Sequence, residues 1–216
     1  MSIKITKEMF DAAVREAQRR EDDGQINHHF SLEHMSDYDR NILGFLGEFA
    51  GREELGFDWR CSIRKNYLKP DNGDVFIDKR IVDIKTETIP KKYFWNIVKR
   101  KYSKDGKEEC KKNIDDIPFG RRLICKDQVD LLRKYDYVLW CAFIREHYEE
   151  WINNGYPGGN AMPDCYCLGY LDTQHIINNY TVVSKAPFGI KYPVPGVPVR
   201  TSELEHIVNL KKLVKL

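Results

Sequence analysis

Residues Gly73–Thr86 read GDVFIDKRIVDIKT, and this stretch carries most of what the sequence says about the fold. Two runs rich in β-branched and aromatic residues, Val75–Ile77 and Ile81–Lys85, are separated by Asp78-Lys79-Arg80. Short apolar runs of this kind on either side of turn residues predict a β-hairpin.

Three ionisable side chains are expected to converge at one end of this hairpin. Asp83 and Lys85 share one face, because side chains alternate along a strand, and Asp74 faces Ile84 or Lys85 across the pair. Carboxylates are hard oxygen ligands suited to Mg²⁺ or Mn²⁺. Such a metal can neutralise a phosphodiester and activate water, while a lysine beside it orients the water or stabilises the phosphate charge. The alternative is an exposed hairpin end with a salt bridge.

The segment before the hairpin predicts a helix that faces the core and runs to about Leu55. Its apolar residues have helical spacing and are Ile42, Phe45, Leu46 and Phe49. Gly44 and Gly47 are each unfavourable in a helix interior, so they indicate that another element packs closely here. Glu48 lies at the flank of the apolar stripe and is expected to reach a cleft at the edge of the core.

The remaining pattern predicts one mixed α/β domain over residues 1–216, built around one central sheet. No internal repeat or second-domain linker is evident. The expected elements are an amphipathic helix at 6–20, a short helix at 126–134, a strand buried on both faces at 137–144, a polar excursion at 145–163, a strand at 165–171, a helical turn at 172–177, an extended segment at 193–198 and a terminal helix at 203–216.

The formal net charge is only +2, but the charge is segregated. Residues 91–126 hold twelve Lys or Arg against five acids, a local net charge of +7, with aromatic residues between them. Basic side chains neutralise phosphates, and aromatic rings stack on unpaired bases. The best phosphate-binding candidates are Lys91 and Lys92, followed by Lys99, Arg100 and Lys101. A solvated charged loop explains the same composition.

Several classes of protein and site are disfavoured. No apolar run approaches the ~18 residues of a membrane span, and the N-terminus lacks a secretory signal, so we expect a cytoplasmic protein. The six cysteines include no Cys-x-x-Cys pair, which favours reduced, buried thiols over a metal centre at Cys165 and Cys167. His28, His29 and His34 lack ligand spacing and are expected in a solvated loop.

The ordered set Glu48, Asp74 and Asp83-Ile84-Lys85 resembles the PD-(D/E)xK nuclease superfamily, whose fold is called restriction-endonuclease-like. The resemblance extends over roughly residues 36–177. Residues 44–50 resemble the family's first core helix, 73–86 its catalytic hairpin, 128–143 its later helix and strand, and 166–177 its last strand and trailing helix. A literal Pro-Asp pair stands at Pro70-Asp71, but Asp74 is preferred because it directly precedes the strand, whereas turn chemistry explains Asp71.

The resemblance implies a central mixed β-sheet flanked by helices and a Mg²⁺- or Mn²⁺-dependent nuclease. It implies Asp74, Asp83 and the Ile84 carbonyl as metal ligands, Lys85 as the residue that orients water or phosphate, and Glu48 as a metal or water contact. DNA is the preferred substrate, cut to leave 5′-phosphate and 3′-hydroxyl ends, and RNA stays open. A homodimer is compatible with cutting two strands, although no interface is evident. The alternative is a catalytically silent nucleic-acid-binding or assembly protein that keeps the fold.

Overall fold

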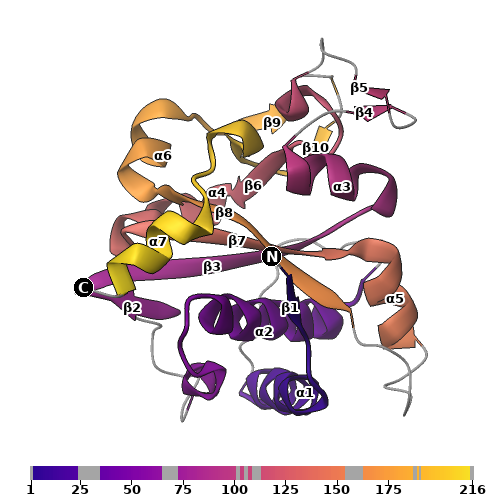
Figure 1. The fold of residues 1–216 in the computed structure, drawn as a ribbon, viewed down its shortest axis with the longest axis vertical. Helices are drawn as coiled ribbons and strands as arrows, with labels where there is room; N and C mark the ends of the chain where they lie inside the picture. Colours follow the sequence, from indigo (N-terminus) through magenta and orange to yellow (C-terminus); the bar gives the residue numbers. More distant parts are fainter. Residues whose placement is uncertain are drawn as a thin grey trace.

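The computed structural model contains a five-stranded mixed sheet that runs through the middle of the molecule (Figure 1). It describes residues 2–23, 35–64, 73–100, 103–104, 107–108, 113–153, 163–186, 189 and 191–214. The strand order in the central sheet is β1-β8-β7-β3-β2, in which only β3 and β7 are parallel. A second, three-stranded antiparallel sheet has the order β6-β10-β9, and β4 pairs with β5. The mixed α/β class expected from the sequence is confirmed.

The elements have the following bounds. The strands are β1 (Ser2–Lys4), β2 (Val75–Ile77), β3 (Arg80–Ile89), β4 (Ser103–Lys104), β5 (Lys107–Glu108), β6 (Arg121–Cys125), β7 (Tyr137–Ile144), β8 (Asp164–Asp172), β9 (Val183–Lys185) and β10 (Lys191–Arg200). The α-helices are α1 (Lys7–Asp22), α2 (Asp37–Glu54), α3 (Lys91–Lys99), α4 (Lys126–Val129), α5 (Arg145–Asn153), α6 (Thr173–Asn179) and α7 (Ile207–Val214). Short 3₁₀ helices cover Trp59–Ser62, Ile114–Asp116, Asp130–Lys134 and Thr201–Glu203.

Both faces of the central sheet are covered. Helices α1 and α2 lie on one face, and α3, α6 and the second sheet lie on the other (Figure 1). Alternate residues of β7 enter two different cores: Leu139, Cys141 and Phe143 pack toward α1 and α2, whereas Trp140 and Ala142 pack toward α3. This confirms that the apolar run at 137–144 is a strand buried on both faces.

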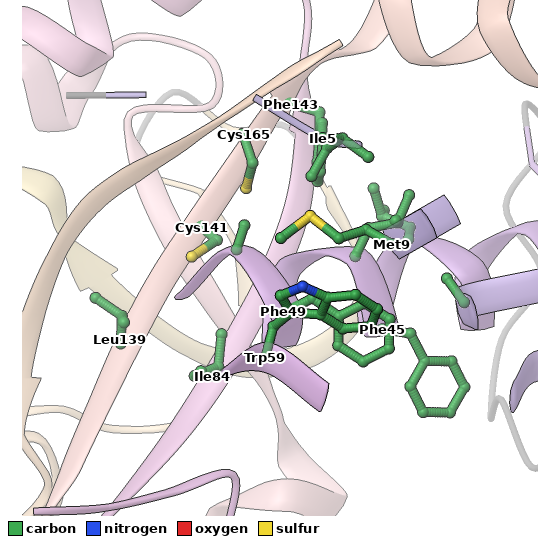
Figure 2. Packing of buried hydrophobic residues seen from close by; sticks show 14 of the residues in the cluster. Ile5, Met9, Phe45, Phe49, Trp59, Ile84, Leu139, Cys141, Phe143 and Cys165 are labelled. Atoms are coloured by element: carbon green, nitrogen blue, oxygen red, sulfur yellow. The ribbon is translucent and has the colours of Figure 1, made fainter. Parts of the chain in front are cut away.

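The core under α1 and α2 is shown in Figure 2. Phe49 from α2 packs against Trp59 with ring centroids 4.9 Å apart, and Phe45, one turn earlier on α2, lies 6.2 Å from Phe49. The sheet contributes small and aliphatic side chains opposite them, among them Ile84 and Cys141. Burial of these apolar side chains is the main force that holds α2, and therefore Glu48, against the sheet.

The hairpin forms as predicted, with a tighter turn and a longer second strand. Asp78 and Lys79 have φ values of 42° and 66°, which fits a two-residue turn matched to the twist of its strands. Strand β2 pairs only with Arg80–Val82, whereas β3 continues to Ile89 alongside β7. The outer edge of β3 beyond Val82 is therefore not covered by β2.

Sequence patterns located most helices and missed elements inside polar or charged stretches. Thr6 caps α1 and accepts a hydrogen bond from the Met9 N–H. The polar excursion predicted at 145–163 is wrong in its first part, because Arg145–Asn153 form α5 and bury Tyr148 and Trp151. The charged segment contains α3 and β6, and the terminal helix begins only at Ile207.

Four of the five cysteines in the described residues are buried or partly buried, and Cys61 is exposed. Cys141 and Cys165 are fully buried, and the Sγ atoms of Cys141 and Cys167 lie 3.5 Å apart on paired strands. Cys110, His28, His29 and His34 lie outside the described residues.

The two glycines in α2 have different surroundings. A Cβ atom at Gly47 would lie 1.7 Å from Thr86 Oγ1 and 2.5 Å from Thr86 Cγ2, so the helix backbone touches β3 there. A Cβ atom at Gly44 would meet nothing within 4 Å. The close packing expected from the sequence is therefore present at Gly47 and absent at Gly44.

This contrast predicts opposite effects of the same substitution. Gly47→Ala should lower the free energy of unfolding by about 1–3 kcal/mol, because Thr86 on β3 has to move. Gly44→Ala should raise it by up to about 1 kcal/mol, because alanine favours the helix and meets no obstacle. Urea unfolding of both variants measures the two changes, and a stable Gly47→Ala protein would contradict the contact.

Candidate active site

The site is built around the open edge of β3. Asp74 directly precedes β2, and its N–H donates to the Val82 carbonyl. Its side chain accepts the backbone hydrogen bond that a paired strand would otherwise accept: the Ile84 N–H donates to Asp74 Oδ2 at 2.6 Å. In an extended strand the N–H and C=O of one residue point to the same side. The Ile84 carbonyl therefore faces the same edge as the Asp74 carboxylate.

Asp83 and Lys85 lie on the face of β3 that looks away from α2. Lys85 Nζ is 3.0 Å from Asp83 Oδ2, although this oxygen, which is buried, accepts no hydrogen bond of good geometry. Burial alone lowers the pKa of Lys85, but the Asp83 and Asp74 carboxylates outweigh it, so the pKa is raised overall. The ammonium group is thus held as a cation beside a buried acid.

Glu48 approaches the same edge from the opposite face of the sheet. Burial raises the pKa of its carboxyl group, Arg64 and Arg20 oppose that shift, and Asp83 adds to it. The pKa of Asp74 is raised well above its usual value, first by burial and then by the Glu48 and Asp83 carboxylates. The three acids therefore lie within one another's electrostatic field, and the close contact at Gly47 is what brings Glu48 there.

Three further residues belong to this site and were not expected from the sequence. Arg52 Nη1 donates to the Asp74 carbonyl at 2.5 Å, and Arg64 Nη2 lies 3.9 Å from Asp74 Oδ1. Burial and then the Asp83 charge raise the pKa of Tyr135. Arg52 stands one helical turn after Glu48, and that spacing could have indicated it. Nothing in the sequence places Arg64 or Tyr135 beside the hairpin.

The oxygen donors at this edge are of the kind that a small divalent cation prefers. They are the carboxylates of Asp74, Asp83 and Glu48 and the Ile84 carbonyl. Within the described residues, no three or more His, Cys, Asp or Glu side chains are grouped closely enough to hold a metal ion. Asp83 Oδ2 is buried and lies 3.0 Å from Lys85 Nζ, so a bound metal ion would share this oxygen with the ammonium group. Asp71 lies outside the described residues.

The proposed phosphate-binding residues differ in their surroundings. Lys91, Lys92 and Lys99 are exposed on α3, which begins directly after β3 ends. Arg100 is committed to the fold, because its guanidinium donates to the Leu204 carbonyl and, at 2.9 Å, to the Leu168 carbonyl. Lys101 lies outside the described residues. The exposed lysines of α3 remain the candidates for contact with a polyanion.

Comparisons with protein-family models, curated proteins and solved structures gave no match. None of the helices in the described ranges is long and apolar enough to cross a membrane.

Proposed function

We propose that the chain is a divalent-cation-dependent nuclease with a restriction-endonuclease-like core and that it hydrolyses phosphodiester bonds in DNA. The observation that carries this proposal is the arrangement at the open edge of β3. Two carboxylates and a lysine from one hairpin meet there, and the charge of Glu48 from α2 reaches the same acids. A purely structural salt bridge at a hairpin end does not require Asp74 to bond the Ile84 N–H or a third acid nearby.

Each residue has a role that its position supports. Asp74, Asp83, Glu48 and the Ile84 carbonyl would hold Mg²⁺ or Mn²⁺. When bound, such a cation neutralises charge on the phosphate and lowers the pKa of its water. Lys85, kept charged beside Asp83, orients the attacking water or a phosphate oxygen. Burial first, and the neighbouring acids after it, raise the pKa values of Glu48 and Asp74, so holding both acids ionised at this edge is favoured by added positive charge.

The polyanion would reach this edge along the basic α3, and the products would carry 5′-phosphate and 3′-hydroxyl ends. The direct test is to incubate the protein with supercoiled plasmid, linear duplex DNA, single-stranded DNA and RNA, each with Mg²⁺, Mn²⁺ or EDTA. We expect cleavage with either cation and none with EDTA. Intact substrates with both cations would exclude the proposal.

One observation favours a second candidate, a nucleic-acid-binding protein that has lost cleavage. Asp83 is already paired with Lys85, and the described acids are not gathered into a ready group of three. This candidate predicts that the protein binds nucleic acid without a metal, that the binding weakens with salt, and that no substrate is cleaved. The incubation above separates the two candidates.

The exposed lysines of α3 give a prediction that holds for both candidates. Lys91→Ala and Lys99→Ala should each weaken DNA binding and reduce the slope of log affinity against log salt by about 1, because one phosphate contact is lost. Lys7→Ala, an exposed lysine on α1 on the other side of the sheet, is the control and should leave the slope unchanged. Salt titrations followed by fluorescence anisotropy measure the slope. Equal slopes in the wild type and all three variants would mean that α3 does not contact the nucleic acid.

A further inference from the structure

A row of two aromatic rings with a cation at each end lies beside the end of β3, and its members come from three separate parts of the chain. Lys92 Nζ lies 4.9 Å from the centroid of the Tyr93 ring. The Tyr93 and Phe119 centroids are 5.7 Å apart with 32° between their planes, and the Arg145 guanidinium lies 5.0 Å from the Phe119 centroid. We call these four residues the cation–aromatic ladder. It joins the start of α3, the loop before β6 and the start of α5.

The ladder contacts the part of β3 that directly follows the candidate active site. Glu87 follows Lys85 on the same face of β3, about 7 Å further along the strand. Glu87 forms an ion pair with Arg122, and the Arg122 guanidinium also donates to the Phe119 carbonyl. Arg145 reaches the last part of the same strand, where its Nε lies 3.4 Å from Thr88 Oγ1. A strand of nucleic acid leaving Lys85 along β3 would therefore meet the ladder next.

The backbone at Phe119 indicates that its exposed ring is held in place at a cost. Its φ value is +62°, which is unusual for a bulky side chain, and yet the residue is 36% exposed. A Cβ atom at the next residue, Gly120, would lie 2.0 Å from the Ile114 carbonyl oxygen, so the corner is tightly packed. A strained, rigid corner that presents an aromatic ring to solvent is not explained by core packing.

We propose that the cation–aromatic ladder binds unpaired nucleotides, so that the substrate class of the candidate site is single-stranded nucleic acid or a strand with unpaired bases. This proposal rests on the proposed function in one respect: the bound strand is taken to pass from the candidate active site to the ladder. A base in a continuous duplex has both faces covered by its neighbours, whereas an unpaired base stacks on an aromatic ring. Lys92 covers the Tyr93 ring with one exposed, flexible side chain. When a base replaces it, the ammonium group can move to the adjacent phosphate.

The test measures binding in EDTA, so that it does not depend on cleavage. The probes are a fluorescein-labelled oligothymidine of about 20 nucleotides, longer than the ~4–16 nucleotides that one small binding fold covers, and a duplex of equal length. Phe119→Asn removes the ring and suits the positive φ value, so the variant should fold with an unchanged or higher melting temperature. Tyr93→Leu is the second variant and keeps an apolar side chain on α3.

Wild-type protein should bind oligothymidine more tightly than duplex at equal salt. Phe119→Asn and Tyr93→Leu should each weaken oligothymidine binding about tenfold and change duplex binding little. Trp95→Leu is the matched control, because Trp95 is also exposed on α3 but contacts Tyr166 instead of the ladder. Tighter binding of duplex, unchanged binding by both ladder variants, or an equal loss in Trp95→Leu would each overturn the proposal. If the protein cleaves none of the substrates but still shows this binding pattern, the nuclease proposal is wrong and the proposal that the ladder binds unpaired nucleotides stands.

Discussion

Asp83→Asn and Lys85→Met are each expected to reduce DNA cleavage by roughly 10²–10³-fold or more, since removing even one hydrogen-bond donor that stabilises the developing charge costs about that much. Both changes preserve size, so the loss reflects charge. Asparagine at Asp83 is a weaker ligand for a divalent cation and no longer holds the Lys85 ammonium as an ion pair. Methionine at Lys85 removes the group that orients water or phosphate. Rates are measured on labelled DNA with Mg²⁺ under single-turnover conditions.

The hairpin itself provides the matched control. Asp78 is an exposed acid in the turn between β2 and β3, and its φ value of 42° suits asparagine. Asp78→Asn makes the same chemical change as Asp83→Asn a few residues away, and we expect an unchanged rate. Cleavage that survives Asp83→Asn, or that is lost equally in Asp78→Asn, would place the chemistry elsewhere.

The double variant with both Asp83→Asn and Lys85→Met gives independent information. Because Asp83 and Lys85 form one ion pair, they should act as a unit. The double variant should then be about as slow as the slower single variant, instead of showing the product of two losses. Multiplicative losses would mean that the two side chains contribute separately and that the ion pair has no part in positioning Lys85.

The hairpin could be predicted because its information is local. Alternating side chains place Asp83 and Lys85 together whatever the rest of the chain does, and Asp74 is fixed by its position before β2. The sequence did not reveal that β2 is too short to cover β3, which is why the Asp74 side chain itself bonds the Ile84 N–H. That edge is set by the lengths of two strands, and strand ends are poorly defined by propensity.

Residues distant along the chain could not be assigned to the site. Arg64 and Tyr135 reach it through tertiary contacts, and a lone arginine or tyrosine has no pattern that indicates its neighbours. Helix α5 was missed for a different reason. Its sequence is mostly polar, and its three apolar residues, Tyr148, Trp151 and Ile152, mark the buried side. Their spacing of i, i+3 and i+4 fits a helix but covers little more than one turn, which is too short for a helical period to stand out.

The sequence also does not distinguish the adjacent residues Arg121 and Arg122, whose tertiary neighbours differ. Substitution of one of them has the largest expected effect on stability. Both stand in the basic segment and look equivalent in sequence, but β6 points them in opposite directions. Arg121 pairs with an exposed acid, Asp116, at 3.3 Å. Arg122 is fully buried, pairs with Glu87 and has a buried Nε without a hydrogen-bond partner. The second arginine is thus an internal counter-charge.

Arg122→Met should lower the free energy of unfolding by about 3 kcal/mol at neutral pH, because Glu87 is left as a carboxylate without its cation. The value lies at the low end for a buried pair, since the Glu87 side chain is 28% exposed. Arg121→Met is the matched control and should change stability by less than about 1 kcal/mol. Urea unfolding at constant pH measures both variants, and equal losses would contradict the different burial of the two arginines.

The pH dependence of the stability loss in Arg122→Met tests whether the unpaired Glu87 carboxylate causes that loss. Burial raises the pKa of Glu87 in the folded protein, and Arg122 is the main group that lowers it, so Arg122→Met should raise the folded-state pKa further. A carboxyl group whose pKa is raised on folding favours the folded state at low pH and disfavours it as the pH rises through that pKa. The deficit of Arg122→Met relative to wild type should therefore shrink as the pH falls. Against a Glu87→Gln background the same substitution should produce a deficit that does not change with pH, and a deficit that still shrinks would assign the effect to another acid.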